Sequence, residues 1–249
     1  SPAGLTLARL KEIGLQAIPD HGPLPVTVPG CVDGWCELHA RFGRLPLPAL
    51  LAPAAAYARE GFPVSPIIAR HWARNAALLE RWSGFKQVFM PGGRAPAKGE
   101  LFRNPGLAAL LERIGREGRA AFYRGAAAQA MAAAVREAGG FLSEADLEAH
   151  RSEWVEPISV VYRGWRVWGL PPNCQGLTTL QMLALLSGHD LARLGFGSAA
   201  YAHLLIEAKK LAFEDRARWC ADPAFAPAPL EALLSGKYAS QRMQRSAEH

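Results

Sequence analysis

Apolar residues recur at helical spacing, every three or four positions, through most of this sequence. The first such pattern, Leu7, Leu10 and Ile13, ends at Gly14. Glycine or proline interrupts the pattern between successive segments, as is typical of short helices joined by tight turns. The pattern therefore predicts a mainly helical chain, with further helices at 33–42, 49–59, 66–82, 107–115, 126–138, 178–186 and from 201 towards 220, and a short one after 227.

A strand pattern stands out at Ile158 to Trp168, where β-branched and aromatic residues are concentrated. Arg163-Gly164 lies in the middle and can supply the positive φ that a tight hairpin turn needs. We therefore predict a β-hairpin with arms 158–162 and 165–168. A second, shorter β run is expected at Val26-Thr27-Val28, closed by Pro29-Gly30.

The hairpin leads into a stiff loop. Pro171 and Pro172 end the second strand because proline cannot donate to a β-ladder, and residues 173–176 form a polar bend before the next helix. Such a junction can hold backbone N–H groups near a reaction centre, but a structural turn is the interpretation we favour. Residues 89–105, rich in glycine and proline, are expected to be a surface loop, and Gly92-Gly93 has the wrong context for a phosphate loop.

Helix signals and one hairpin place the chain in the α+β class, mainly helical. Within residues 1–249 we expect a helical subdomain at 33–150, the hairpin with its loop at 155–177 and a helical return at 178–249. Three local contacts are expected as well: Asp33 and Ser143 as helix caps, and Glu207 paired with Lys210. The almost continuous alanine run of 126–138 predicts a helix packed closely against a neighbour.

Composition excludes some classes of function. The net charge is +6 and the pI about 9.4, but the 28 basic residues are scattered and interrupted by acids, so we expect no nucleic-acid partner. No apolar run is long enough to span a membrane, so no membrane partner is expected either. The four cysteines have neither CxxC nor zinc-ligand spacing, which predicts buried free thiols and favours a cytoplasmic location over a periplasmic or secreted one.

Several residues of the sequence are candidates for a catalytic or metal-binding role. Ser1 as an N-terminal nucleophile is disfavoured by Pro2 and by the absence of a strand pattern to hold it, so Ser1→Ala is expected to leave activity unchanged. His39 is expected to be an ordinary helix histidine. Asp146, Glu148 and His150 are two residues apart, which scatters them around a helix, so no metal site is expected. The residues alone thus predict no cofactor and no catalytic residue, and leave substrate-binding residues unknown.

Seven stretches, in this order, carry a resemblance to a known family. They are VTVPGCVDGW at 26–35, RFGRLPLPALLAPAAAYAREGFPVSP at 41–66, AFYRG at 121–125, GGFLSEADL at 139–147, YRGW at 162–165, PPNCQG at 171–176 and HLLIEAKKLAFEDR at 203–216. Together they closely resemble the large-subunit region of the γ-glutamyltransferase family, over nearly the whole chain.

The resemblance implies an N-terminal-nucleophile hydrolase, made as a precursor that cuts itself into a large and a small subunit sharing one αββα sandwich. The freed N-terminal threonine of the small subunit would attack a γ-glutamyl amide such as glutathione and pass the acyl group to water or an amino acid. A hydroxyl nucleophile, an α-amine base and backbone N–H groups around the oxyanion suit this chemistry. The implied partners are the small subunit and a γ-glutamyl substrate.

Two departures from the family pattern bear on function. The nucleophilic threonine and the arginine that grips the substrate α-carboxylate have no match here, and Thr178-Thr179 is internal and not the nucleophile. Where glutathione-cleaving members carry PPPSSGG, this chain has PPNCQGL at 171–177, which resembles γ-glutamyltransferase-like and cephalosporin-acylase-like members. The alternatives are therefore an acylase for glutaryl or cephalosporin-type amides, or a non-catalytic stand-alone module.

Overall fold

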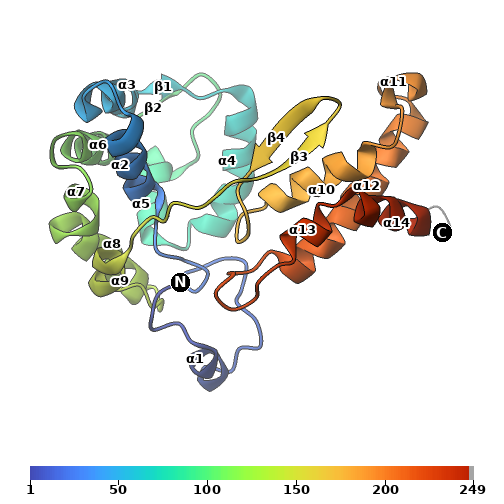
Figure 1. The fold of residues 1–249 in the computed structure, drawn as a ribbon. Helices are drawn as coiled ribbons and strands as arrows, with labels where there is room; N and C mark the ends of the chain where they lie inside the picture. Colours follow the sequence, from blue (N-terminus) through green and yellow to red (C-terminus); the bar gives the residue numbers. More distant parts are fainter. Residues whose placement is uncertain (247–249) are drawn as a thin grey trace. The chain divides into compact units, whose positions relative to one another are not determined.

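The computed structural model describes residues 1–246 and divides the chain into two compact units, 1–152 and 153–249 (Figure 1). No helix in the described part of the chain is long and apolar enough to cross a membrane.

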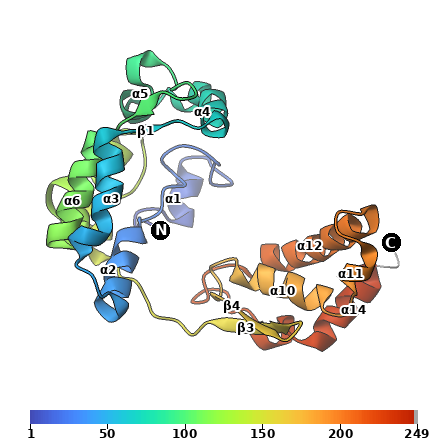
Figure 2. The same cartoon turned by 90° about the horizontal axis from the view of Figure 1, so that it is seen from above.

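The first unit is built almost entirely of helices, joined by short turns. Their bounds are α1 Leu7–Glu12, α2 Cys31–Phe42, α3 Leu47–Glu60, α4 Pro66–Leu79, α5 Ser83–Phe89, the 3₁₀ turn η1 Pro91–Gly93, α6 Pro105–Glu117, α7 Ala120–Tyr123, α8 Gly125–Glu137 and α9 Glu144–Ala149. Two strands of two residues each, β1 Phe62–Pro63 and β2 Leu101–Phe102, pair antiparallel. Helices α3 and α6 pack side by side, as Figures 1 and 2 both show.

The core of this unit is formed by buried residues from several helices. Val32 of α2, Ile114 of α6 and Tyr123 of α7 are buried there with residues from α8 and α9. Ala128 and Ala132 are buried on α8, which confirms that the alanine-rich helix packs closely against neighbours. Small side chains let helix backbones approach closely, so this helix is stabilised by packing and not only by propensity.

The described part of the second unit combines the hairpin with five helices, of which α11 and α13 have four residues each. Its elements are β3 Ile158–Tyr162, β4 Trp165–Gly169, α10 Gly176–Leu186, α11 Leu191–Leu194, α12 Ala199–Trp219, α13 Leu230–Leu233 and α14 Gly236–Ser246. Both strands contact α10, and α10 also contacts α12 and α14. Leu185, Leu186, Ala208, Ala212 and Ala239 form the buried core between these helices.

The hairpin is confirmed in register and turn. Val160 lies opposite Val167, and Tyr162 lies opposite Trp165. Arg163 (φ 51°) and Gly164 (φ 85°) both have positive φ, as the two-residue turn matching strand twist requires. Val160 is buried, whereas Trp168 on the other face is 59% exposed.

Several predicted boundaries hold because their signals are local. Ser65 caps α4, Gly61 ends α3, and Ser143 caps α9 in a reciprocal capping box with Asp146. The predicted Glu207–Lys210 pair is present at 2.8 Å.

Other predictions are wrong. Val26 to Val28 forms no strand, because Pro25 and Pro29 flank it and no neighbouring strand pairs with it in the described structure. The helix expected at 66–82 ends at Leu79 and a separate α5 follows. Helices α7 and α14 were not expected. All four cysteines are free, but Cys31 and Cys174 are exposed and not buried as predicted.

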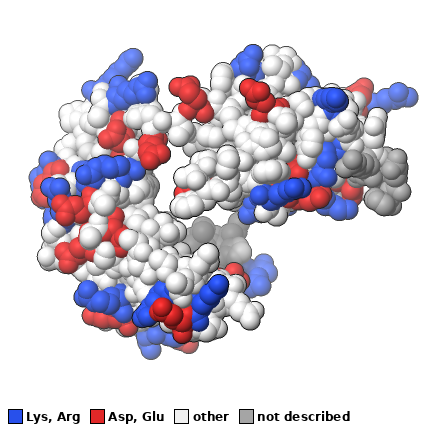
Figure 3. Space-filling model, turned by 60° about the horizontal axis from the view of Figure 1, so that its bottom comes forward, with Lys and Arg blue, Asp and Glu red and all other residues white. Residues whose placement is uncertain are grey.

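Charged side chains are mixed in sign along the surface. On the face in Figure 3, acidic and basic residues are interspersed among broad uncharged areas. This distribution agrees with the scatter of basic residues in the sequence.

Candidate functional site

A buried carboxylate, Asp33, lies in the VPGCVDG segment at the start of α2. Its side chain is 1% exposed and accepts hydrogen bonds from Nε of Arg119 and from the backbone N–H of Ser152. Gly30 and not Asp33 occupies the cap position, so the predicted capping role is wrong. Asp33 remains in the first turn of the helix, where a negative charge is favoured by the helix dipole.

Arg119 connects this carboxylate to the end of the helical unit. Its Nη2 donates to the carbonyl oxygens of Glu148 (3.2 Å) and His150. Together with the Ser152 N–H bond, these contacts fasten residues 148–152 to the beginning of α2. The segment that leads out of the first unit is therefore fixed by one ion pair.

Tyr123 of α7 contacts the same segment at the start of α2. It is fully buried, and its hydroxyl donates to the carbonyl oxygen of Pro29 (2.6 Å) and accepts the N–H of Asp33 (3.2 Å). Its ring stacks on His150, with centroids 5.6 Å apart, and Arg119 lies over its face. Burial raises the pKa of the Tyr123 hydroxyl, so it stays a donor at neutral pH. Sequence reasoning missed this residue, and its only signal was the AFYRG motif.

The arrangement fits a positioning role better than acid–base chemistry. Burial acts to raise the pKa of the Asp33 carboxyl, but hydrogen bonds from Ser152 and the Arg119 guanidinium outweigh it, and the pKa lies below its ordinary value. Asp33 is therefore an anion at neutral pH, and its oxygens are already bound. Nε2 of His150 lies 4.0 Å from Oδ2 of Asp33 and has no hydrogen-bond partner in the described structure.

The three residues once considered for a metal have separate partners. Asp146 accepts the N–H of Ala3 and of Ser143, Glu148 pairs with Arg124 at 2.9 Å, and His150 stacks on Tyr123. Within the described residues, no group of three His, Cys, Asp or Glu side chains could hold a metal ion. His39 is bonded to the carbonyl oxygen of Leu45, an ordinary role.

In the second unit, the PPNCQG loop joins β4 to α10 by a close backbone contact. A Cβ on Gly176 would lie 2.3 Å from the carbonyl oxygen of Leu170, so only glycine fits there. Thr178 is buried in α10, with its hydroxyl unpartnered in the described structure, while Thr179 is exposed. Neither is at a chain terminus, as expected for threonines that are not the nucleophile.

A second buried carboxylate, Asp215, ties three helices of this unit together. It accepts hydrogen bonds from Nε2 of Gln181 (2.9 Å) and from the hydroxyl of Tyr238 (2.9 Å), and Arg242 lies 3.6 Å away. Arg242 also pairs with Glu214. These contacts fix α14 against α10 and α12.

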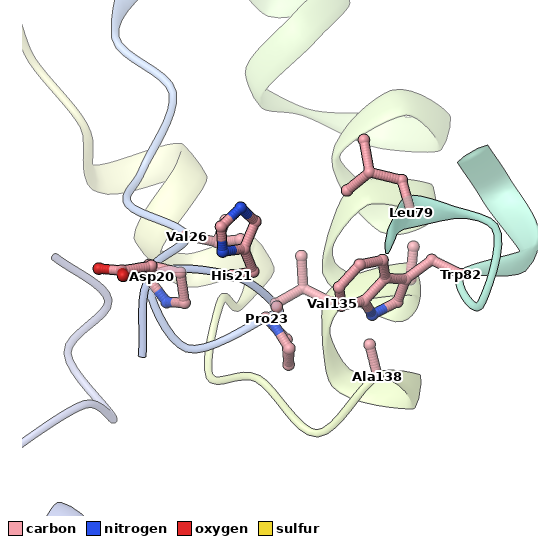
Figure 4. A pocket seen from close by; sticks show the side chains of 11 residues that line it. Asp20, His21, Pro23, Val26, Leu79, Trp82, Val135 and Ala138 are labelled. Atoms are coloured by element: carbon pink, nitrogen blue, oxygen red, sulfur yellow. The ribbon is translucent and has the colours of Figure 1, made fainter. Parts of the chain in front are cut away.

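An open pocket of about 420 Å³ lies in the first unit (Figure 4). Trp82, Leu79 and Val135 form apolar walls, and the segment around His21 forms another side. The carboxylate of Asp20 points away from Trp82 in Figure 4. The pocket can take up an apolar group, but its lining contains no titratable groups besides Asp20 and His21.

Comparison with known proteins decides the family. The gamma-glutamyltranspeptidase family model matches residues 1–248. The chain belongs to this family. The resemblance seen in the sequence is thereby confirmed, and with it the fold: a mainly helical α+β part of an N-terminal-nucleophile hydrolase.

The similar proteins include both hydrolases and acylases. The chain is 42% identical to the glutathione hydrolase-like YwrD proenzyme of Bacillus subtilis, over 96% of this chain and 46% of that protein. It is 42% identical to the acylase ACY 1 proenzyme of Pseudomonas sp. strain V22, over 89% of this chain and 40% of that protein. Its structure resembles that of cephalosporin acylase from Bacillus halodurans, with a TM-score of 0.89, 39% identity, and coverage of 98% of this chain and 46% of that one.

The chain thus spans less than half of the length of these relatives. Two of these relatives are named as proenzymes, one glutathione hydrolase-like and one an acylase, and the solved structure is that of an acylase.

Proposed function

We propose that this chain is the large-subunit portion of a γ-glutamyltransferase-like hydrolase that cleaves γ-glutamyl amides, of the glutathione type, through an acyl-enzyme. The observation that carries the proposal is the family match over residues 1–248. The word proenzyme in the relatives' names supports self-cleavage and a small-subunit partner. Under this proposal, residues 33–150 are a helical subdomain, 155–177 the hairpin and its loop, and 178–249 the helical return.

The nucleophile in this proposal is a threonine at the new N-terminus of the small subunit. Its hydroxyl attacks the amide carbonyl, its own α-amine takes the proton, and backbone N–H groups stabilise the oxyanion. Water or an amino acid then accepts the glutamyl group. Under this proposal, the present chain forms part of the scaffold that shapes the substrate site and contributes no catalytic residue. Its Asp33–Arg119 pair holds residues 148–152, and the Tyr123 hydroxyl holds the turn at Pro29-Gly30.

A second candidate function is an acylase for glutaryl or cephalosporin-type amides. The identity to acylase ACY 1 equals that to the glutathione hydrolase-like relative, at 42%. The PPNCQGL sequence at 171–177 points the same way, because it departs from the PPPSSGG of glutathione-cleaving members. A γ-glutamyl group carries a free α-amino group that a glutaryl group lacks. An enzyme that selects γ-glutamyl substrates therefore needs an anionic side chain that binds this amine, and an acylase for glutaryl amides does not.

The test uses the full coding region, read beyond His249 and before Ser1. The expressed protein should appear as two polypeptides, and replacing the predicted threonine by alanine should leave one uncut chain. Initial rates with γ-glutamyl-p-nitroanilide and with the matching glutaryl anilide then separate the functions. Faster γ-glutamyl turnover supports the first candidate and faster glutaryl turnover the second. An uncut protein, inactive on both amides, or a stop codon directly after His249, would favour a non-catalytic module.

A further inference from the structure

Two cysteines that are 46 residues apart in sequence meet in the second unit. Cys220 follows the last residue of α12, and its Sγ lies 4.0 Å from the backbone carbonyl oxygen of Cys174. Cys174 lies in the PPNCQG loop, two residues before α10 begins. We propose that Cys174 and Cys220 are a redox site that closes a reversible disulfide between this loop and the end of α12.

The first requirement for such a bond is access. Cys174 is exposed and Cys220 is partly exposed, and both are free thiols in this structure. A small oxidant can therefore reach Cys174 without unfolding the unit. The residues on both sides of it, Asn173 and Gln175, are also exposed, so the attacking group meets no packed side chain.

The second requirement is reach. A disulfide forms only when the two Cα atoms approach to about 4.4–6.8 Å with the side chains directed at each other. The Cys220 sulfur lies 4.0 Å from the main-chain carbonyl oxygen of Cys174, so the proposed bond requires side-chain rotation and a movement of the loop that bring the two sulfurs together. Neither cysteine lies within a helix, because Cys174 is in the loop and Cys220 is the C-cap of α12. The N–H of Cys220 donates to the carbonyl oxygen of Arg216, so the movement is expected in the loop at Cys174 and not at the end of α12.

The chemistry balances with a small symmetrical disulfide as the oxidant. The thiolate of Cys174 attacks one sulfur of the oxidant and releases one small thiolate, leaving a mixed disulfide on Cys174. The thiolate of Cys220 then attacks the Cys174 sulfur and releases the second small thiolate. The two protein thiols lose two electrons and two protons, and the oxidant becomes two small thiols.

The other two cysteines form a matched control pair within the same chain. Cys31 and Cys36 are both on α2, five residues apart, which places them about 140° apart around the helix. Burial raises the pKa of the Cys36 thiol, which lowers its thiolate fraction further. An exposed thiol alone therefore does not predict pairing here, and only the pair at the loop meets both requirements.

The experiment treats the reduced full-length protein, under native conditions, with bis(2-hydroxyethyl) disulfide. This oxidant carries no γ-glutamyl group, so the result is independent of the proposed function. Remaining thiols are trapped with N-ethylmaleimide, and peptides are identified by mass spectrometry. We expect a peptide pair joined through Cys174 and Cys220, lost on reduction, while Cys31 and Cys36 carry the small mixed disulfide or N-ethylmaleimide and are joined to no other cysteine.

Single variants complete the test. Cys174→Ser and Cys220→Ala should each abolish the linked peptides and leave the remaining cysteine as a mixed disulfide or a labelled thiol, whereas Cys36→Ser should leave the link unchanged. The proposal is overturned if wild-type Cys174 and Cys220 carry only separate mixed disulfides or N-ethylmaleimide. It is also overturned if the link appears only in denaturant, because the fold would then not direct it.

Discussion

At the scale of single residues, the Asp33–Arg119 pair connects distant parts of the first unit. The two residues are 86 positions apart, and each also binds the segment 148–152. Removing one partner from a buried ion pair leaves the other charge uncompensated, which is far more costly than losing an exposed pair.

We predict that Asp33→Asn lowers the free energy of unfolding of this unit by roughly 3–5 kcal/mol. The amide keeps the shape of the carboxylate but leaves the Arg119 guanidinium, itself only 22% exposed, without its counter-charge. Denaturant unfolding of the full-length protein measures the loss, and hydrogen exchange should show faster exchange at the Ser152 amide. Glu100→Gln is the matched control, because its pair with Arg94 is exposed, and it should leave both readouts nearly unchanged.

The same variant should change how stability depends on pH. The folded pKa of Asp33 lies below its unfolded value of about 3.9, so its contribution is present above that pH and is lost as the pH falls through the folded pKa. The difference between wild type and Asp33→Asn should therefore shrink as the pH falls below about 4, the ordinary pKa of an aspartate. A difference that stays constant over this range would show that the charge of Asp33 is not what stabilises the unit.

Local residue roles were predictable and distant ones were not. The Ser143 cap and the Glu207–Lys210 pair depend on residues three positions apart, so sequence spacing reveals them. Asp33 was expected to cap the helix that begins beside it, because that interaction needs only neighbouring residues. Its real partners, Arg119 and Ser152, are far away in sequence, and nothing in the local pattern points to them.

At the scale of elements, the junction between β4 and α10 depends on one glycine. Gly176 begins α10, and a Cβ there would lie 2.3 Å from the carbonyl oxygen and 2.8 Å from the nitrogen of Leu170. Backbone atoms cannot move aside as a flexible side chain can. The strand end and the helix start would have to separate to make room.

We predict that Gly176→Ala destabilises the second unit by about 3 kcal/mol, the upper end of typical overpacking costs. Thermal or denaturant unfolding, followed by the fluorescence of Trp165 and Trp168 in single-tryptophan backgrounds, measures it. Gly188→Ala is the control: nothing lies within 4 Å of its added Cβ and its φ is not positive, so it should be neutral or slightly stabilising. Equal effects of the two substitutions would contradict a steric origin at Gly176.

Element prediction succeeded where the boundary signal is local and failed where pairing is needed. Ser65 and Gly61 mark helix ends by their own side-chain and backbone chemistry, and Arg163-Gly164 marks the hairpin turn. The β run at Val26 to Val28 has strand propensity but no partner, and propensity alone does not make a strand. The two-residue strands β1 and β2 depend on a contact across about 40 residues, which no local pattern reveals.

At the scale of the whole molecule, the ordered motifs predicted the family, and the family match confirmed it. The physical patterns alone predicted only a mainly helical chain with a hairpin, because catalytic chemistry was not readable from any local cluster. The same holds for the loop at 171–176. The sequence predicted a stiff loop there, but it did not predict that Cys174 lies near Cys220, because that proximity depends on the fold of the whole second unit.

The hairpin also bears on how this chain behaves alone. A two-stranded ribbon is marginal in water unless a larger sheet or another layer covers it. One face of the hairpin packs on α10. Trp168 and Val161 on the other face are 59% and 58% exposed, and Trp165 at the turn is 78% exposed. Under the proposed function, the rest of the sandwich covers these side chains.

We therefore predict that residues 1–249 expressed alone aggregate or bind a hydrophobic dye strongly and hydrolyse no γ-glutamyl amide. An obligate interface buries about 2,000–5,000 Å², and at roughly 25 cal/mol per Å² of apolar area its loss outweighs the net stability of a domain. Co-expression with the remainder of the protein should restore a soluble complex. Dye fluorescence and size-exclusion chromatography of the two preparations measure the difference.

A double substitution on the exposed strand face locates the effect. Val161→Thr with Trp168→Thr keeps β-branched residues in both strands, so the hairpin should persist while dye binding by the isolated chain falls. The same change should weaken the co-expressed complex, because it removes apolar area from the proposed interface. The control is Ile67→Thr. Ile67 is an exposed residue of α4 in the other unit, and its substitution should leave the complex intact. A dye-silent monomer of residues 1–249 with a sharp cooperative melt would contradict the prediction and favour a stand-alone module.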